Sequence, residues 1–157
     1  MCASSLVADV TGRVRVIDGD TFDVAGERVR LFGIDAPEGK QTCETEQGAQ
    51  WACGAWVTSQ VTVMFDKKRA ICREEARDRY GRIVARCEVE GRDVGQLLVS
   101  EGLAFAYRTY SMRYDLDEKR AAVNDRGLHA SRVQSPAQFR ATRAKGRIPP
   151  DRACAIK

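Results

Sequence analysis

Short strand-like segments with few helices between them constrain the fold of this chain most strongly. Apolar and polar residues alternate in most of these segments, as in half-buried β-strands. The five segments cover residues 14–16, 22–24, 28–34, 61–65 and 83–89. The turn Asp18-Gly19-Asp20 joins the first two strands as a hairpin. Because helices do not alternate with the strands, we predict a small closed barrel and not a parallel sheet.

Three helices are expected beside these strands. An amphipathic pattern predicts the first over residues 44–60. Apolar residues mark a second helix over 94–101, which the following glycine ends. The third, a charged helix, covers 114–124. The highly charged segment 67–80 is predicted to be a loop, and the last residues, from 131 onward, are expected to wrap over the surface.

Six cysteines in 157 residues indicate an oxidising compartment. They contain no CxxC pair, which argues against a zinc site. An even number fits three disulfides, and buried free thiols are the alternative. We expect a secreted or periplasmic protein, although the first residues do not resemble a secretory signal peptide. The expected pairs are Cys43–Cys53, Cys72–Cys87 and Cys2–Cys154, the last of which would join the two ends.

Positive charge is concentrated at the C-terminal end. Residues 130–157 contain seven Lys or Arg and one acidic residue, whereas the rest of the chain has nineteen basic and twenty-one acidic residues. A basic segment favours polyanions such as nucleic acid or an acidic glycan, and a solvated chain end is the alternative. No apolar run approaches the ~18 residues that cross a membrane, so no membrane partner is expected.

Three carboxylates lie at predicted strand ends, where loops emerge. Asp20 belongs to the hairpin turn, and Asp35 and Glu38 follow the third strand. Clustered carboxylates stay ionised together only when a cation joins them, and oxygen ligands select Ca²⁺ or Mg²⁺. Arg30, five residues before Asp35, would grip a substrate phosphate with two hydrogen bonds. In the alternative interpretation, Asp18 and Asp20 only form the turn and Arg30 is a surface residue.

A further motif, Asp78-Arg79-Tyr80-Gly81-Arg82, reveals a family resemblance. It follows a DGDT turn at 18–21 and an R-x-x-x-x-D-x-P-E strand end at 30–38. The chain resembles staphylococcal-nuclease-type domains, which show these motifs in this order. The resemblance implies an α+β fold, a five-stranded OB-type barrel with three helices. It divides the chain into an N-terminal extension (1–11), a nuclease domain (12–130) and a basic C-terminal tail (131–157).

The resemblance also implies a Ca²⁺-dependent endonuclease that hydrolyses DNA and RNA to 3′-phosphorylated products. The cation ligands would be Asp20, Asp35 and the carbonyl of Ala36, where the family often has threonine. Arg30 and Arg82 match the arginines that hold the scissile phosphate and stabilise its transition state. Glu38 matches the proposed general base, and ordering the water and metal shell is its alternative role.

Aromatic residues are candidates for stacking on nucleic-acid bases. Family members carry tyrosines after the second helix, and Tyr107 and Tyr110 lie close to that pattern, with a core position as the alternative for Tyr107. Tyr80 and Asp78 of the third motif are also assigned to substrate binding. His129 is the only histidine, which excludes a histidine-based nuclease mechanism, and it is expected to be structural.

Two other functions remain open at this point. The same type of barrel can bind oligonucleotides or oligosaccharides without cleaving them. A pure binding module, however, has no need for a carboxylate beside a scissile phosphate. Some bacterial relatives are associated with succinoglycan exopolysaccharide biosynthesis, so an accessory role there, using the basic tail, is the second alternative. We expect DNA and RNA as substrates and a monomeric protein.

Overall fold

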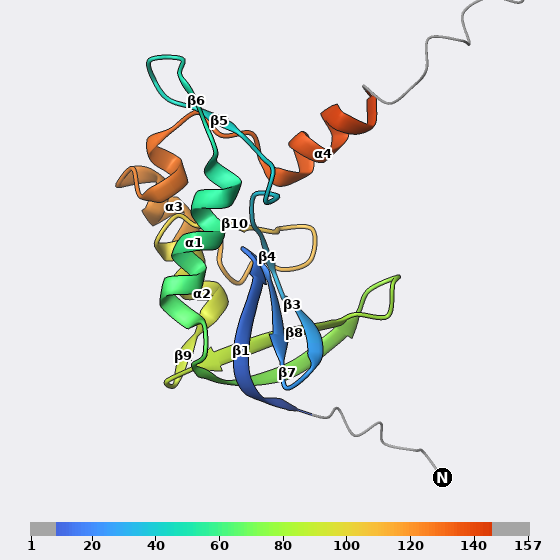
Figure 1. Ribbon diagram of the computed structural model, residues 1–157. Coiled ribbons are helices and arrows are strands. Elements are labelled where there is room, and N and C mark those ends of the chain that lie inside the picture. The colour runs from blue at the N-terminus through green and yellow to red at the C-terminus, as the bar shows by residue number, and fades with distance from the viewer. Residues whose placement is uncertain (1–8, 146–157) are drawn as a thin grey trace, which may run out of the picture.

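Five strands close into a barrel in the computed structural model, which describes residues 9–145 (Figure 1). The barrel strands are β1 (Val10–Asp18), β2 (Thr21–Val24), β3 (Glu27–Leu31), β7 (Arg69–Arg77) and β8 (Ile83–Val89). Neighbouring strands pair antiparallel in the order β3-β2-β1-β7-β8. Parallel pairing of β3 with β8, in which Arg30 lies opposite Val84, closes the barrel. The predicted α+β fold with a five-stranded barrel is therefore confirmed.

The alternating pattern of β3 determines which of its side chains reach the candidate site. Val29 and Leu31 are buried in the barrel core, whereas Arg30 between them is only partly buried. Successive side chains of a strand point to opposite faces, so Arg30 projects from the barrel wall. Buried alternate residues of β8, including Ala85 and Cys87, complete the core beside β3.

The fourth barrel strand, β7, lies within the segment 67–80, where a loop was predicted. That prediction was wrong because the alternation in β7 is carried by two small buried residues, Ala70 and Cys72, between charged neighbours. Some of the charged side chains of the β7–β8 hairpin form ion pairs, Arg86 with Glu75 and Arg77 with Glu74. These pairs allow a strongly charged sequence to form a long twisted hairpin.

Helix α1 (Cys53–Phe65) begins and ends later than the helix predicted over 44–60. Residues 61–65, predicted as a strand, are its last turn and a half. The earlier residues instead form a small hairpin of β5 (Cys43–Glu44) and β6 (Gln50–Trp51). The buried side chains recur every four residues, which is a helical and not a strand period. They are Cys53, Val57, Val61 and Phe65.

Three further helices lie after the barrel strands, so the described residues contain four helices where three were predicted. They are α2 (Val94–Ser100), α3 (Asp115–Val123) and α4 (Pro136–Lys145), with a 3-10 turn at Gly127–Ala130. Two short elements, β4 (Ile34–Asp35) and β10 (Phe105–Ala106), pair with each other, and β9 (Arg92–Asp93) pairs antiparallel with the end of β8. None of the helices in residues 9–145 is long and apolar enough to cross a membrane.

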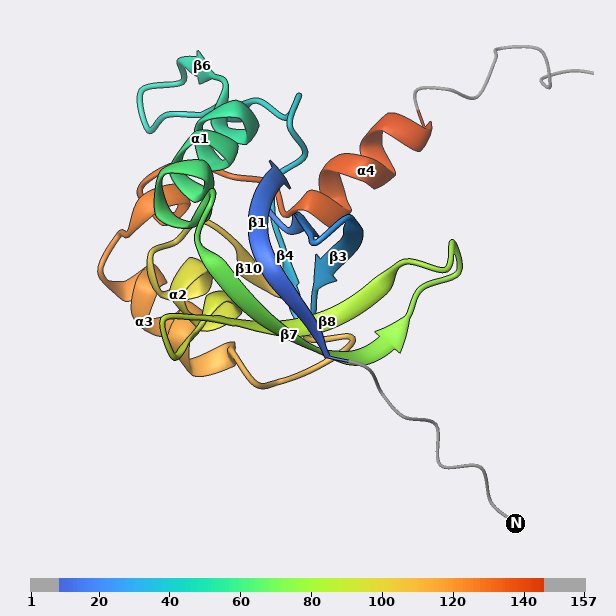
Figure 2. The same cartoon turned by 60° about the horizontal axis from the view of Figure 1, so that its bottom comes forward.

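The additional helix, α4, occupies the part of the basic tail that was expected only to wrap the surface. Its start is capped reciprocally: the Ser135 hydroxyl accepts from the Gln138 amide at 3.2 Å, and the Gln138 side chain accepts from the Ser135 amide at 3.1 Å. This capping box favours a helix, which the charge count alone did not indicate. Figures 1 and 2 show α4 and the tip of the β7–β8 hairpin projecting on the same side of the barrel.

The structure contains two of the three expected disulfides. Cys43–Cys53 joins β5 to the start of α1, and Cys72–Cys87 joins the paired strands β7 and β8. The expected pair Cys2–Cys154 lies outside the described residues. The two disulfides link segments that lead directly to the candidate site described below.

Candidate active site

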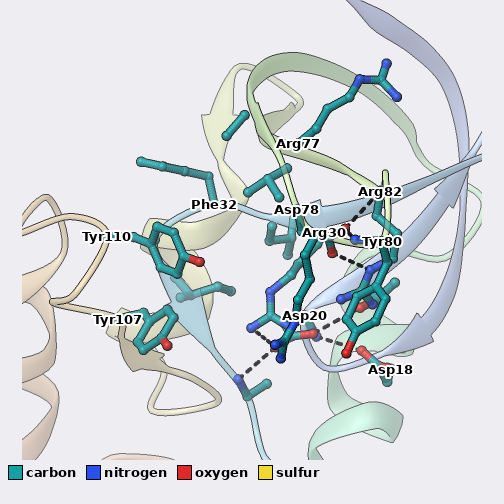
Figure 3. Close-up of a pocket in the computed structure, with 18 of the residues that line it drawn as sticks. Asp18, Asp20, Arg30, Phe32, Arg77, Asp78, Tyr80, Arg82, Tyr107 and Tyr110 are labelled. Carbon is teal, nitrogen blue, oxygen red and sulfur yellow. Dashed lines mark hydrogen bonds and ion pairs between the residues drawn. The ribbon is translucent and has the colours of Figure 1, made fainter. Parts of the chain in front are cut away.

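A pocket of ≈ 590 Å³ collects side chains from widely separated parts of the chain (Figure 3). Its wall includes the turn after β1, the end of β3 with the residues that follow it, the loop between β7 and β8, and α4. Figure 3 shows Arg30 in the centre, with Tyr80 and Arg82 on one side and Tyr107 and Tyr110 on the other. The structure thus brings all three sequence motifs to one place.

Two of the predicted carboxylates, Asp20 and Asp35, meet at the Arg30 guanidinium. Its Nη2 lies 3.4 Å from Asp20 Oδ2 and 3.2 Å from Asp35 Oδ1. Both carboxylate side chains are almost fully buried, with 9% and 4% of their surface exposed. The Ala36 amide also donates to Asp20 Oδ2, at 3.2 Å, which fixes the start of the Asp35–Glu38 segment against the turn after β1.

Burial of Asp20 has a large electrostatic effect. It raises the pKa of the Asp20 carboxyl to about 6, although the Arg30 charge acts in the opposite direction. The neighbouring Asp18 carboxylate adds to the upward shift of this pKa. Asp18 itself acts as a turn former, because its Oδ1 accepts from the Asp20 amide at 3.1 Å. The positive charge of Arg30 therefore does not fully offset the unfavourable effect of burial on the ionised Asp20 carboxylate.

The third carboxylate, Glu38, does not join the other two through Arg30. Its Oε1 instead accepts from Arg140 Nη1 at 2.9 Å, and the same guanidinium contacts both oxygens of Asp35, at 3.3 and 2.8 Å. Sequence analysis missed Arg140, which lies outside all three motifs on α4. Its position between Asp35 and Glu38 raises the pKa of the Arg140 guanidinium, through the hydrogen bond to Asp35 above all.

The loop between β7 and β8 is organised around the Asp78 carboxylate. Asp78 Oδ1 accepts from the amides of Tyr80 and Arg82, at 2.9 and 3.0 Å, and Oδ2 accepts from Arg82 Nε at 2.6 Å. Desolvation acts to raise the Asp78 pKa, but these hydrogen bonds outweigh it and hold the pKa below its ordinary value. Gly81 closes the turn with a φ of 77°, which glycine adopts readily.

Arg82 keeps its terminal nitrogens available at the pocket. Within residues 9–145, the hydrogen bonds of its side chain use only Nε. Its guanidinium also lies over the Tyr80 ring, 5.7 Å from the ring centre. Asp78 therefore holds the arginine by one edge and leaves the other edge of the fork free.

The tyrosines after α2 form a second aromatic group at the pocket. The Tyr107 and Tyr110 rings are 5.0 Å apart and tilted by 55°. The Tyr107 amide donates to the Gly33 carbonyl at 2.8 Å, which attaches this segment to the end of β3. Tyr110 and Tyr80 are largely exposed, at 65% and 72%, whereas His129 lies away from the pocket, edge-on to Phe105.

The first turn of α1 supports the segment that carries Glu38. The Gly54 amide donates to the Gln41 carbonyl at 3.0 Å, and a side chain at Gly54 would overlap the carbonyl oxygen of Glu38. The close approach of the two backbones therefore requires glycine at this position. The Cys43–Cys53 disulfide joins the same two segments.

Replacing Gly54 by alanine should lower stability by about 1–3 kcal/mol, because the added methyl group must displace the backbone at Glu38. Chemical denaturation measures this change in the free energy of unfolding. Gly39→Ala is the matched control, since a Cβ at Gly39 meets no atom within 4 Å. Equal stability of the two variants would show that α1 does not constrain the Glu38 segment.

The sequence matches the family model described as staphylococcal nuclease homologue over residues 28–129. It is 37% identical over 150 residues to the succinoglycan biosynthesis protein ExoI of Rhizobium meliloti, covering 94% of this chain and 70% of the relative. It is 38% identical over 112 residues to an uncharacterized endonuclease of Escherichia coli, covering 68% and 67%.

A third relative, a micrococcal nuclease of Shigella flexneri, is 32% identical over 152 residues, covering 85% of this chain and 82% of the relative. The family match includes the motifs around Arg30 and Arg82 but ends before α4. It also begins after Asp20.

Proposed function

Because this chain belongs to the family of staphylococcal nuclease homologues, we propose that it is a Ca²⁺-dependent endonuclease that hydrolyses DNA and RNA to 3′-phosphorylated products. Relatives named as an endonuclease and a micrococcal nuclease support a hydrolytic nuclease acting on nucleic acid. The observation that carries the proposal is the meeting of Asp20 and Asp35 at Arg30, in the pocket that Arg82 also lines.

The donor chemistry of the site fits a hard divalent cation. Asp20 and Asp35 are buried oxygen donors held close together, and burial of Asp20 is incompletely compensated by Arg30. Calcium prefers carboxylate and carbonyl oxygens, so Asp20, Asp35 and the Ala36 carbonyl would hold it. No three acidic, histidine or cysteine side chains converge on one point in residues 9–145, so water and substrate oxygens would complete the shell. The bound cation would neutralise negative charge on the phosphate.

Two arginines would act on the scissile phosphate. Arg30 projects from β3 beside the buried carboxylates, and Arg82 presents its unused edge from the β7–β8 loop. A phosphodiester is anionic, and more charge accumulates on its oxygens as water attacks. Fixed guanidinium groups aimed at these oxygens stabilise the transition state more than the ground state. Asp78 contributes by holding Arg82 and by closing the loop.

Glu38 is the proposed general base. With about half of its side chain exposed, it stands at the pocket wall, where water has access. It would take a proton from the attacking water as the new bond to phosphorus forms. The bond from phosphorus to the 5′ oxygen breaks, that oxygen takes up a proton, and the phosphate stays on the 3′ side. Ordering the water and the cation is the alternative role for Glu38.

Two exposed tyrosines, Tyr80 and Tyr110, and the partly buried Tyr107 would bind the bases on either side of the reacting phosphate. Tyr80 belongs to the loop that carries Arg82, and Tyr107 and Tyr110 lie on the opposite side of the pocket (Figure 3). A base stacked on an aromatic ring contributes about 1–3 kcal/mol with little dependence on sequence. This arrangement suits an enzyme that acts on both DNA and RNA.

We propose a nuclease domain over residues 12–130, preceded by residues 1–11 and followed by the basic segment 131–157.

The two disulfides support a secreted or periplasmic location, and we propose that the protein acts as a monomer. The name of the Rhizobium relative is the one indication of a role in exopolysaccharide biosynthesis. The carboxylate and arginine site gives that role no further support.

Analysis of the products tests the proposal against a non-catalytic binding module. End-labelled DNA and RNA oligonucleotides are incubated with the protein and Ca²⁺, and the fragments are treated with phosphatase before separation. Internal cleavage with fragments whose 3′ ends carry a phosphatase-sensitive group is expected. Oligonucleotides that shift in a native gel but remain intact would identify a binding module instead.

A further inference from the structure

The basic helix after the family match supplies a side chain to the site. Arg140 of α4 lies 102 residues from Glu38 along the chain, and its Nη1 lies 2.9 Å from Glu38 Oε1. It is also the second guanidinium on Asp35: it shares Oδ1 with Arg30 and, within residues 9–145, alone contacts Oδ2. Resting on the function proposed above, we infer that Arg140 is a positioning residue, which orients the cation ligand Asp35 and the general base Glu38 from outside the matched domain.

Asp35 needs this second partner because Arg30 is shared. One Arg30 nitrogen, Nη2, contacts both Asp20 and Asp35. If Arg30 binds a substrate phosphate, its hold on the carboxylates weakens at the moment of reaction. Arg140 contacts both oxygens of Asp35 and so keeps the buried carboxylate in one orientation independently of Arg30. Partners that orient metal ligands in this way are a general feature of metal sites.

Glu38 depends on Arg140 still more directly. Among the groups of residues 9–145, Arg140 supplies the one hydrogen bond to the Glu38 carboxylate. The Glu38 side chain is 46% exposed, so little packing restricts its rotamers. Fixing a base within reach of the attacking water avoids a loss of orientational entropy in the transition state.

The start of α4 is attached to the segment that carries these carboxylates. The buried Gln41 side chain connects the two, since its Oε1 accepts from the Glu38 amide at 3.3 Å and its Nε2 donates to the Gln134 carbonyl at 3.0 Å. Backbone hydrogen bonds between Glu44 and Arg132, at 3.3 and 2.9 Å, add a second attachment. Together with the buried Pro136, these contacts fix the position from which Arg140 extends.

The charge balance of the site favours a positioning role for Arg140 over a role in which Arg140 displaces the cation. Asp20, Asp35 and Glu38 provide three negative charges, and Arg30 and Arg140 provide two positive charges. The site therefore keeps a net negative charge with both arginines in place. Carboxylate oxygens accept more than one partner, so Asp35 can hold Arg140 and a cation together.

Arg140→Lys tests the inference, because it keeps the charge but cannot hold Asp35 and Glu38 together with one fork. We expect kcat for DNA hydrolysis to fall about 10-fold or more, and the Ca²⁺ dissociation constant, measured by calorimetry without DNA, to rise about 10-fold. Arg143→Ala is the matched control on α4, where Arg143 lies over the Phe139 ring. It should leave kcat and Ca²⁺ binding at wild-type values.

Wild-type kcat and Ca²⁺ binding in Arg140→Lys would overturn the inference. So would faster cleavage or tighter Ca²⁺ binding in Arg140→Ala, because Arg140 would then compete with the cation. The calorimetric comparison separates this inference from the proposed function. If the wild-type chain binds Ca²⁺ but cleaves no nucleic acid, the nuclease proposal fails, whereas weaker Ca²⁺ binding by Arg140→Lys would still support the positioning of Asp35.

Discussion

Replacing Arg82 by lysine should lower kcat for DNA hydrolysis by about 10³-fold. The charge is retained, but lysine has no planar fork that can contact Asp78 with one edge and a phosphate oxygen with the other. The 2.6 Å hydrogen bond from Arg82 Nε to Asp78 is lost, and the remaining point charge is no longer aimed at the phosphate. Steady-state hydrolysis of a single-stranded oligonucleotide in saturating Ca²⁺ measures the effect.

Arg79→Lys is the matched control for Arg82→Lys. Arg79 belongs to the same loop and lies over the same Tyr80 ring, 5.2 Å from its centre, but within residues 9–145 its side chain forms no hydrogen bond or ion pair with Asp78. It should lose little activity. If both variants lose the same small factor, the loop contributes only general positive charge, and Arg82 has no specific role in the transition state.

Replacing Glu38 by glutamine should lower kcat by about 10²–10⁴-fold while Ca²⁺ binding changes little. Glutamine has nearly the same shape, and its carbonyl oxygen can still accept from Arg140. It cannot take a proton from water, so the loss appears in the chemical step. Single-turnover cleavage together with calorimetric Ca²⁺ titration separates the two effects.

Glu27→Gln, an exposed substitution at the start of β3, is the control for Glu38→Gln and should behave as the wild type. A large rise in the Ca²⁺ dissociation constant of Glu38→Gln would support the alternative role, in which Glu38 orders the cation and its water. Unchanged kcat would remove Glu38 from the mechanism altogether.

Much of the barrel could be predicted from the sequence because its pattern is local. In β8, alternate residues such as Ile83 and Val89 are buried as the alternation indicates. The turn at Asp18 could likewise be predicted, because it is formed by residues that are adjacent in the sequence. Strand β7 was not predicted because its buried residues are small and lie between charged residues. The bounds of α1 were predicted wrongly because Val61 and Phe65 fit a strand pattern when they are considered without Val57.

In the candidate site, too, some features can be recognised from neighbouring residues, whereas others depend on contacts between distant parts of the chain. The motifs around Asp20, Arg30 and Arg82 could be found from their spacing, and the structure brings them to one pocket. The role of Arg140 could not be predicted from sequence spacing, because it depends on where α4 packs. The position of α4 in turn depends on contacts such as that of Gln41 with Gln134. The number of Lys and Arg residues indicated only that the segment 131–157 is basic.

Cleavage of single-stranded DNA by the wild-type chain, in Ca²⁺ and in EDTA, tests the central claim most directly. The site described here predicts cleavage in Ca²⁺, loss of cleavage in EDTA, and recovery when Ca²⁺ is added back in excess. Circular dichroism on the same samples verifies that the protein stays folded throughout. Intact DNA in millimolar Ca²⁺, with the protein folded, would contradict the nuclease assignment and leave a nucleic-acid-binding barrel.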